Sequence, residues 1–185
     1  MKKMKHRISA LTLLAITILS ASCVKQKLET TYNSQEDKID QYIEKNRIVS
    51  GDTLRVVYNE GTARLVTKEG EGPELTQNGN IAFYYAGYTF SGSFSSSNLF
   101  VTNHRETAGQ AGWDLTDADY SIYEISLTDA RLTTGLRDGL IGVKSGEECE
   151  ILFSGKYGFG NKAFGIIPAN SAQLWKIWVV GVSNE

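Results

Sequence analysis

The chain has 185 residues, of which 41% are apolar and 22% are charged, with 2 prolines and 18 glycines; this suits one globular domain with its own core and excludes a disordered tail, a collagen-like repeat and a multi-domain machine. The formal net charge is −2, and the basic residues Lys2, Lys3, Lys5 and Arg7 lie in an N-terminal segment without acidic residues. The remainder is therefore net acidic and has no long basic run, which argues against nucleic-acid binding because phosphate neutralisation needs clustered Lys and Arg.

The first 22 residues have the three parts of a secretory signal: a basic start, an apolar stretch over 8–19 and small residues before Cys23. The apolar stretch is shorter than the roughly 20 residues that span a bilayer. The junction over 19–23 resembles the lipobox of bacterial lipoproteins, although Ser20 stands where an aliphatic residue is more usual. This resemblance implies a signal peptide over 1–22 and lipidation of Cys23. The alternative is an ordinary secretory signal with an incidental cysteine.

The segment after Cys23 divides into two predicted parts. Residues 23–33 are polar, without an apolar period, and suit a short tether. Ser34 is predicted to begin a helix, with Asp37 three residues later in a capping-box pattern and Ile39, Tyr42 and Ile43 at helical spacing. We therefore expect an N-terminal helix and linker over 34–51, packed on the main domain. A partner-binding helix is the alternative.

Residues 52–185 are predicted to form one domain, in which short apolar runs are separated by turn signals. The predicted strands cover 54–58, 63–67, 81–90, 99–103, 121–127, 148–153 and 172–180, and one short helix is predicted over 132–143. On the strand at 121–127, the set Tyr123, Ile125 and Leu127 should be the more buried. These elements predict an α+β domain with a mostly antiparallel sheet.

Conventional catalytic motifs are absent from the sequence. Cys149 alternates with Ile151 and Phe153 on one strand face and has acidic neighbours, so it is interpreted as a buried hydrophobe and not a nucleophile. His104 is the single histidine after the signal, which excludes a His-rich zinc site built from this chain alone. The Gly-x-Gly-x-x-Ala match at 158–163 is not followed by a predicted helix, which phosphate binding in a dinucleotide site requires. Asp114 and Asp117 are interpreted as a solvated turn. The sequence therefore predicts no covalent catalytic residue, no metal and no cofactor.

Several motifs together resemble the FKBP family of peptidyl-prolyl cis-trans isomerases. They are Gly-Leu-Arg-Asp-Gly-Leu-Ile-Gly-Val-Lys-Ser-Gly at 135–146, Tyr-Gly-Phe-Gly at 157–160, Gly-Ile-Ile-Pro at 165–168, Leu-Trp-Lys-Ile-Trp at 174–178, and upstream Glu-Gly-Glu-Gly-Pro at 69–73 and Tyr-Tyr-Ala-Gly at 84–87. The resemblance covers about residues 52–183. It implies a curved, mostly antiparallel sheet wrapped around one short helix, with an apolar proline-binding pocket between them. Residues 87–120 form a longer stretch than usual, and the resemblance gives it no role.

The resemblance also implies the residues of this pocket. They are Tyr85, Phe100, Val101, Tyr123, Leu132, Thr133, Leu136, Phe159, Ile166, Ile167 and Trp175. By this resemblance Leu136 forms the floor, the backbone N–H of Thr133 donates to the substrate, and the Ile166 region forms a flap. The residues alone leave open that Leu136 and Trp175 belong simply to the core, whereas the rings at 85, 100, 123 and 159 favour a ligand cavity.

Three pocket positions depart from the family pattern. Phe159 stands where tyrosine is common, Val101 where aspartate is usual, and Leu136 where tryptophan is common. Two functions therefore stay open: a prolyl isomerase that assists the folding of exported proteins, or an FKBP-like peptide-binding or chaperone module with little or no catalysis. In either case the expected partners are proline-containing polypeptides, and we expect a monomer held by a lipid anchor in the bacterial cell envelope, at the outer membrane, facing the periplasm or the cell surface.

Overall fold

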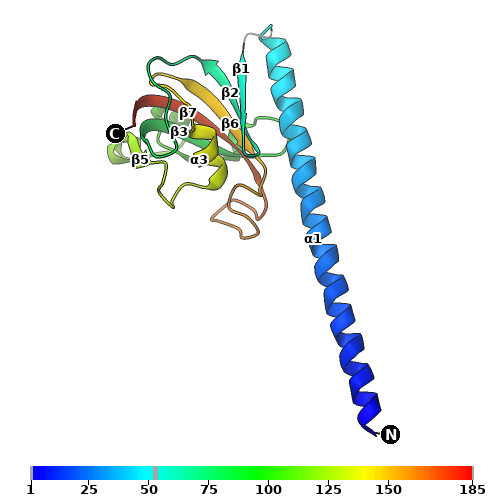
Figure 1. Cartoon of the computed structure of the whole chain (residues 1–185). Coiled ribbons are helices and arrows are strands. Elements are labelled where there is room, and N and C mark those ends of the chain that lie inside the picture. Colours follow the sequence, from blue (N-terminus) through cyan, green and yellow to red (C-terminus); the bar gives the residue numbers. More distant parts are fainter. Residues whose placement is uncertain (1, 52–53, 185) are drawn as a thin grey trace.

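A computed structural model describes residues 2–51 and 54–184, and it gives only the backbone course of residues 2–24. A long N-terminal helix lies beside a curved sheet that wraps around one short helix (Figure 1). In chain order the elements are α1 (Lys2–Val49), β1 (Arg55–Asn59), β2 (Thr62–Lys68), β3 (Asn80–Phe90), the 3-10 helix η1 (Ser96–Asn98), β4 (Leu99–Thr102), α2 (Arg105–Gln110), the 3-10 helix η2 (Asp117–Tyr120), β5 (Tyr123–Ser126), α3 (Thr134–Leu140), β6 (Glu148–Phe153) and β7 (Ala172–Ser183).

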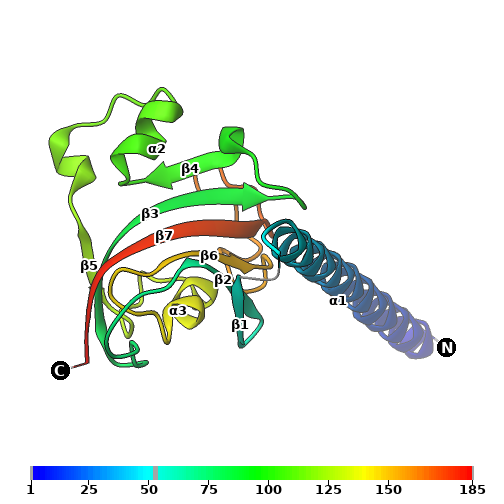
Figure 2. The ribbon, with the colours of Figure 1, turned by 90° about the horizontal axis from the view of Figure 1, so that it is seen from above.

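The seven strands form one antiparallel sheet in the order β1-β2-β6-β7-β3-β4, and β5 also pairs with β3. Figure 2 shows the curvature of this sheet, with α3 on its concave side and α1 at the opposite end from β5. The predicted α+β class and the mostly antiparallel sheet around a short helix are thus confirmed.

The edge of β3 is shared between β4, which pairs near Gly87, and β5, which pairs near Ile81. Asn103 fills the interval between them. Its side-chain oxygen accepts from the Tyr85 backbone N–H at 2.7 Å, and its amide nitrogen donates to the backbone carbonyls of Phe83 at 3.4 Å and Ser121 at 2.9 Å. This buried side-chain amide therefore supplies hydrogen bonds to the edge of β3 in the interval between β4 and β5.

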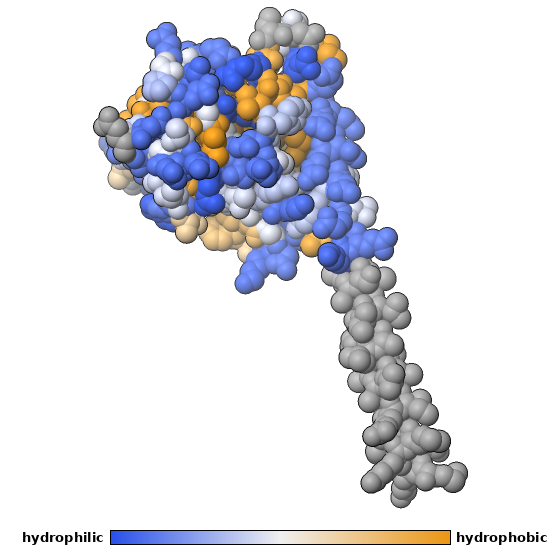
Figure 3. Space-filling view, viewed as in Figure 1, coloured by the Kyte–Doolittle hydropathy of each residue, from blue (hydrophilic) through white to orange (hydrophobic). Residues whose placement is uncertain are grey.

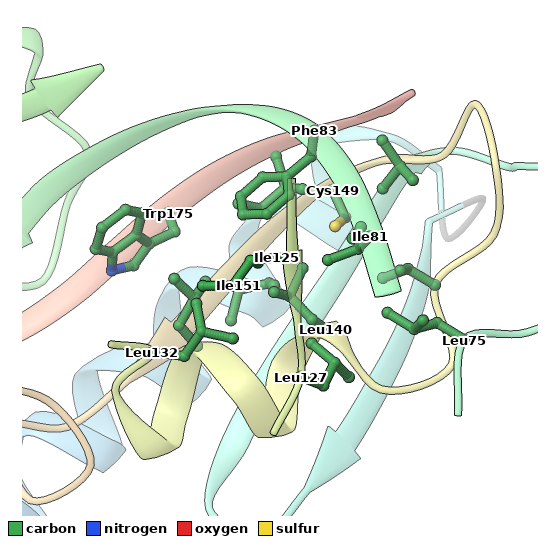
Figure 4. Close-up of a cluster of buried hydrophobic side chains, with 14 of the residues drawn as sticks. Leu75, Ile81, Phe83, Ile125, Leu127, Leu132, Leu140, Cys149, Ile151 and Trp175 are labelled. Atoms are coloured by element: carbon green, nitrogen blue, oxygen red, sulfur yellow. The ribbon is translucent and has the colours of Figure 1, made fainter. Parts of the chain in front are cut away.

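Alternation along the strands separates two apolar clusters, one on each face of the sheet. Cys149, Ile151 and Phe153 of β6 belong to one buried cluster with residues of α3, which confirms the predicted shared face of this strand. Figure 4 labels Cys149 and Ile151 in this cluster on the concave side. Tyr123, Ile125 and Leu127 belong to the same cluster and Leu127 is fully buried, which confirms the predicted face of β5. The convex face holds the second cluster, in which Leu152 packs with side chains of α1.

The N-terminal helix differs from the sequence expectation. The prediction that a helix begins at Ser34 is wrong, because α1 runs through 23–33, the segment expected as a polar tether. No glycine or proline interrupts residues 1–50, and the Lys, Gln, Leu and Glu residues there favour helix. The helix ends before Gly51, which has a φ of +69°.

The leader itself lies outside what the structure tests. The side chain of Cys23 is outside the described residues, and the predicted signal peptide over 1–22 stays a prediction. No helix combines the length and apolarity needed to cross a membrane in the part of the chain that the structure describes.

The helix predicted over 132–143 is shorter in the structure than expected. It ends at Leu140, and Gly142 has a φ of +82°.

Two glycines of α3 allow this helix to approach β6 closely. A Cβ on Gly135 would lie 2.3 Å from Cγ of the buried Phe153, and one on Gly139 would lie 2.3 Å from Cγ2 of Ile151. Glycine weakens an isolated helix by about 1 kcal/mol relative to alanine. Here the close packing on β6 offsets that cost, so the glycines that argue against a helix in the sequence are what let it pack.

We expect Gly135→Ala to lower the free energy of unfolding by about 1–3 kcal/mol, because the added methyl overpacks the buried Phe153 ring. Gly109→Ala in α2 is the matched control, since its Cβ would meet nothing within 4 Å. That control should be neutral or stabilising by up to about 1 kcal/mol. Urea unfolding of both variants measures the difference, and a Gly135 variant as stable as the control would contradict the close packing of α3 on β6.

Candidate functional site

Four aromatic side chains from four different strands meet on the concave face. Trp175 of β7 is 7% exposed, and half-buried rings of Tyr85, Phe100 and Tyr123 lie around it. The Trp175 ring centroid is 5.9 Å from that of Tyr85 and 5.5 Å from that of Phe100, the latter edge-on. Tyr123 lies 5.7 Å from Tyr85, also edge-on. We call these four rings the aromatic site; each such edge-to-face contact stabilises the arrangement modestly.

Aliphatic side chains underlie and border these rings. Leu132 and Leu136 are buried in the same cluster, and Val101 packs against it from β4. Figure 4 shows Leu132 below Trp175, at one end of the row of buried side chains that continues toward Leu75. The structure therefore brings together seven of the predicted pocket residues in a single cluster. Because the rings at its margin are only half-buried, part of the aromatic site faces solvent.

Thr133 lies at the start of α3, beside this cluster, and acts as its N-cap. Its hydroxyl accepts from the Leu136 backbone N–H at 3.4 Å. Within residues 2–51 and 54–184, no acceptor takes the backbone N–H of Thr133 itself. This N–H is therefore a donor available to a ligand, at the end of the helix where the partial positive charge of the backbone lies.

The remaining predicted residues lie on a loop over 156–169, which we call the flap loop. Phe159 stacks on Phe164 with centroids 4.9 Å apart, Ile166 is 76% exposed, and Ile167 is buried. Among the described residues, none of the predicted residues of the flap loop belongs to the cluster around Trp175. Figure 3 shows apolar colour at the lower edge of the domain, where Figure 1 draws this loop. The flap loop thus presents exposed apolar side chains that are separate from the aromatic site.

Gln173 is a site residue that the sequence analysis missed. It is fully buried, and its side-chain oxygen accepts from the Trp175 indole N–H at 2.9 Å. This hydrogen bond satisfies a donor that would otherwise be buried without a partner, and it holds the indole in one orientation. The available signal is the spacing, because residues two apart in a strand share one face of the sheet, which places Gln173 beside Trp175.

Burial sets the protonation states near the site. Desolvation raises the pKa of Tyr85, with a smaller contribution from Tyr123, so its hydroxyl is protonated at neutral pH. Desolvation also raises the pKa of Cys149 far above the usual range, which keeps the buried thiol protonated and unreactive. His104 lies elsewhere, stacked on Trp178 at 3.9 Å, and burial lowers its pKa. The aromatic site is therefore neutral and apolar, with polar donors at its margin.

Comparisons with known proteins agree with this geometry. The family described as FKBP-type peptidyl-prolyl cis-trans isomerase matches residues 74–180. FK506-binding protein 1A of Neurospora crassa is 30% identical over 126 residues, which cover 64% of this chain and 86% of the relative. FK506-binding protein 1 of Aspergillus oryzae is 19% identical over 123 residues, covering 66% of this chain and 99% of the relative.

The fold is similar to that of solved structures. The crystal structure of FkpA from Escherichia coli superimposes with a TM-score of 0.55 at 19% identity, and the match covers 93% of this chain and 70% of that chain. A multi-domain immunophilin from Arabidopsis thaliana gives a TM-score of 0.53 at 19% identity, covering 71% of this chain and 46% of that chain. At this identity the likeness concerns the fold alone.

Proposed function

The chain belongs to the FKBP-type peptidyl-prolyl cis-trans isomerase family, and we propose that it catalyses cis-trans isomerisation of X-Pro bonds in exported proteins. The observation that carries this proposal is the set of half-buried rings around Trp175, next to the free backbone N–H of Thr133. An apolar concave site with a few polar groups at its margin is typical of small-ligand and peptide recognition. Here the ligand would be a proline side chain with its flanking backbone.

The reaction needs no nucleophile, metal or redox group. Amide resonance opposes rotation about the peptide bond with a barrier of roughly 18–20 kcal/mol, so X-Pro isomerisation takes tens of seconds or longer without a catalyst. Resonance also separates charge in the planar amide, and an apolar environment disfavours that planar form. Rings that exclude water therefore favour the twisted transition state, in which the charge separation is lost.

Each part of the site has a distinct task in this proposal. The Trp175 ring is the platform on which the proline ring lies, and Tyr85, Phe100 and Tyr123 enclose it. The Thr133 N–H donates to a substrate carbonyl beside the rotating bond and fixes its position. A millionfold acceleration requires about 8 kcal/mol of differential transition-state binding, which is the sum that desolvation and these hydrogen bonds must supply.

The direct test is an isomerase assay on short Ala-Leu-Pro-type peptides, read by protease coupling or by NMR exchange. The intact chain should accelerate isomerisation in proportion to its concentration. Uncatalysed isomerisation takes tens of seconds or longer. An observed rate within about twofold of this uncatalysed rate would refute the catalytic proposal.

A second function, peptide binding with little catalysis, is favoured by two residues and by the flap loop. Phe159 and Val101 stand where the family commonly has a hydrogen-bonded Tyr and Asp. Phe164 is 63% exposed and Ile166 is 76% exposed. An exposed apolar loop beside an aromatic site suits the binding of unfolded segments. Suppression of aggregation of an unfolded protein, without acceleration of peptide isomerisation, would support this alternative over the first.

Restoring the polar pair should raise the isomerase rate. In the family pattern these positions hold a tyrosine and an aspartate that hydrogen-bond each other, an interaction of about 1–3 kcal/mol when buried. Phe159 stacks on Phe164 outside the cluster that contains Val101, so the double variant Phe159→Tyr with Val101→Asp gains this pair when the flap loop approaches β4. Phe159→Tyr alone should gain less, because its hydroxyl has no partner to hold it. The peptide assay compares kcat/KM for wild type and both variants. A double variant slower than wild type would count against the assigned positions of Phe159 and Val101 in the site.

We also propose that Cys23 anchors the protein to a membrane of the cell envelope through an attached lipid. The support is the lipobox-like junction before Cys23, because acylation of a chain terminus gives a domain affinity for membranes. Cys23→Ala should leave the domain folded but either release it from membranes or leave its signal uncleaved. Fractionation and mass measurement of the N-terminus check this expectation. A processed variant that still sediments entirely with membranes would overturn the lipoprotein assignment.

A further inference from the structure

The part of α1 that meets the domain is built into it by buried apolar and polar contacts. Ile39 and Ile43 of α1 are 4% and 2% exposed and pack in the convex cluster with Leu152 and Leu174. Tyr42 donates its hydroxyl to a carboxylate oxygen of Glu150 at 2.8 Å. These contacts fix the register of the helix on the sheet, so the side chains one to three turns earlier in α1 have defined partners as well.

Gln35 bridges the two ends of the flap loop. Its amide nitrogen donates to the backbone carbonyl of Asn170 at 2.7 Å, and its side-chain oxygen accepts from the backbone N–H of Gly155 at 2.8 Å. Tyr32, which is 6% exposed, donates its hydroxyl to the side-chain oxygen of Asn170 at 2.8 Å. One helix face therefore binds both residues that flank the loop.

Gly155 and Asn170 form a tight neck at the base of the loop. A Cβ on Gly155 would lie 2.3 Å from the carbonyl carbon and oxygen of Asn170, so the two backbones are in direct contact. Asn170 has a φ of +58°, in the left-handed region that asparagine adopts more readily than most residues other than glycine, and its N–H donates to the Gly160 carbonyl at 2.7 Å. The hydrogen bonds of Tyr32 and Gln35 therefore connect α1 to both sides of this neck.

The neck also connects to the proposed catalytic face. Tyr157, two residues after Gly155, packs against the cluster that contains Trp175, and its carbonyl accepts from the Gly135 N–H of α3 at 2.8 Å. Gly135 is two residues from Thr133, whose N–H is the proposed substrate donor. A shift of the neck would therefore displace both the flap loop and the first turn of α3.

We propose that Gln35 and Tyr32 of α1 are positioning residues, which hold the flap loop in place for substrate binding at the aromatic site. The N-terminal helix then contributes to the substrate site. This inference rests on the proposed function in so far as it concerns substrate, but the ordering of the loop by α1 can be measured without it.

The test compares Gln35→Leu with Ser34→Leu in the full chain. The two changes are adjacent on α1, but Ser34 is exposed and Gln35 contacts the neck. Losing a typical hydrogen bond corresponds to a factor of about five in an equilibrium. Amides of Gly155, Asn170 and the flap loop should exchange with solvent about fivefold or more faster in Gln35→Leu, and KM for a proline peptide should rise by a similar factor with kcat little changed. Ser34→Leu should match wild type in both measurements.

Gln35→Glu provides the conservative comparison, because it keeps the acceptor for the Gly155 N–H and loses the donor to Asn170. It should slow exchange at Gly155 toward the wild-type value. The Asn170 N–H, which donates to the Gly160 carbonyl inside the loop, should stay fast because the lost donor no longer holds the Asn170 carbonyl. If flap-loop exchange in folded Gln35→Leu equals that of wild type, or if exchange rises while KM is unchanged, the positioning role is wrong and the proposed isomerase function stands. If wild type itself does not isomerise peptides, the catalytic proposal fails, and the affinity for a proline peptide replaces KM as the measure on which the positioning role stands or falls.

Discussion

Trp175→Ala should remove most of the isomerase activity at a moderate cost in stability. Trp175 is 7% exposed and supports Tyr85 and Phe100, so truncation should lower the free energy of unfolding by about 3 kcal/mol, at the low end for a buried tryptophan. The substrate should lose more, because the ring is the platform for the proline. A loss of about 3 kcal/mol in transition-state binding lowers kcat/KM by more than about 100-fold.

Trp178→Ala is the matched control for this prediction. Trp178 lies on the same strand but packs against the convex cluster, where it stacks on His104 at 3.9 Å. It should lower stability and leave kcat/KM of the folded fraction near the wild-type value. Peptide kinetics corrected for the folded fraction, together with urea unfolding, measure both effects. Equal activity losses in the two variants would mean that Trp175 acts only through the core.

Arg64→Met should have the largest effect on stability among the changes considered. Arg64 is 3% exposed and lies 3.3 Å from the fully buried carboxylate of Glu147. One of its terminal nitrogens donates to the carbonyls of Gly139 at 2.8 Å and Ile141 at 2.7 Å, at the end of α3. Removing one partner of a buried pair costs about 3–5 kcal/mol, and Glu147 would keep as its ion-pair partner the more exposed Arg55, whose guanidinium lies 3.5 Å from its carboxylate. Lys68→Met removes an exposed ion pair of the same strand, with Glu148, and should cost far less.

The pH dependence of Arg64→Met distinguishes an electrostatic cause from lost packing. Desolvation raises the pKa of Glu147 above its ordinary value, and the charge of Arg64 opposes this shift. In the variant the pKa should therefore rise further. A carboxyl whose folded-state pKa is raised binds its proton more tightly when folded, so the variant should be relatively more stable below the unfolded pKa of about 4.3 and lose stability as pH rises through the folded pKa. A stability deficit in Arg64→Met that does not change with pH would indicate lost packing alone.

Local patterns in the sequence were sufficient for most of the fold. Alternation placed Cys149, Ile151 and Phe153 on one buried face, and the same period identified Ile125 and Leu127, because each pattern depends only on neighbouring residues in one strand. The start of α1 could not be predicted in the same way. The polar residues over 23–33 are compatible with either a tether or a helix, and the contacts that fix the helix come from residues far along the chain, such as Asn170.

The sequence predicted only part of the aromatic site. The resemblance identified the rings that come from regular strands, and the structure gathers these around Trp175. It did not predict the polar side chains that position them. Asn103 bridges β3 to a neighbouring segment, a role that depends on where distant parts of the chain meet. Gln173 orients the indole of Trp175, two residues along the same strand, and a single glutamine in a strand does not by itself indicate that its side chain will be buried beside a tryptophan. The flap loop differs most, because Phe159 stacks on Phe164 and not on the rings of the aromatic site.

The most direct test of the central claim is the NMR response of the tryptophan indole N–H groups to a proline peptide. The chain has 3 tryptophans, so the three indole signals report separately on Trp113, Trp175 and Trp178. Titration with an unlabelled Ala-Leu-Pro-type peptide should shift the Trp175 signal in a saturable way and leave the Trp178 signal on the convex face unchanged. Saturable shifts confined to Trp113 or Trp178, with the Trp175 signal unmoved, would show that proline binds elsewhere and would contradict the assignment of the aromatic site.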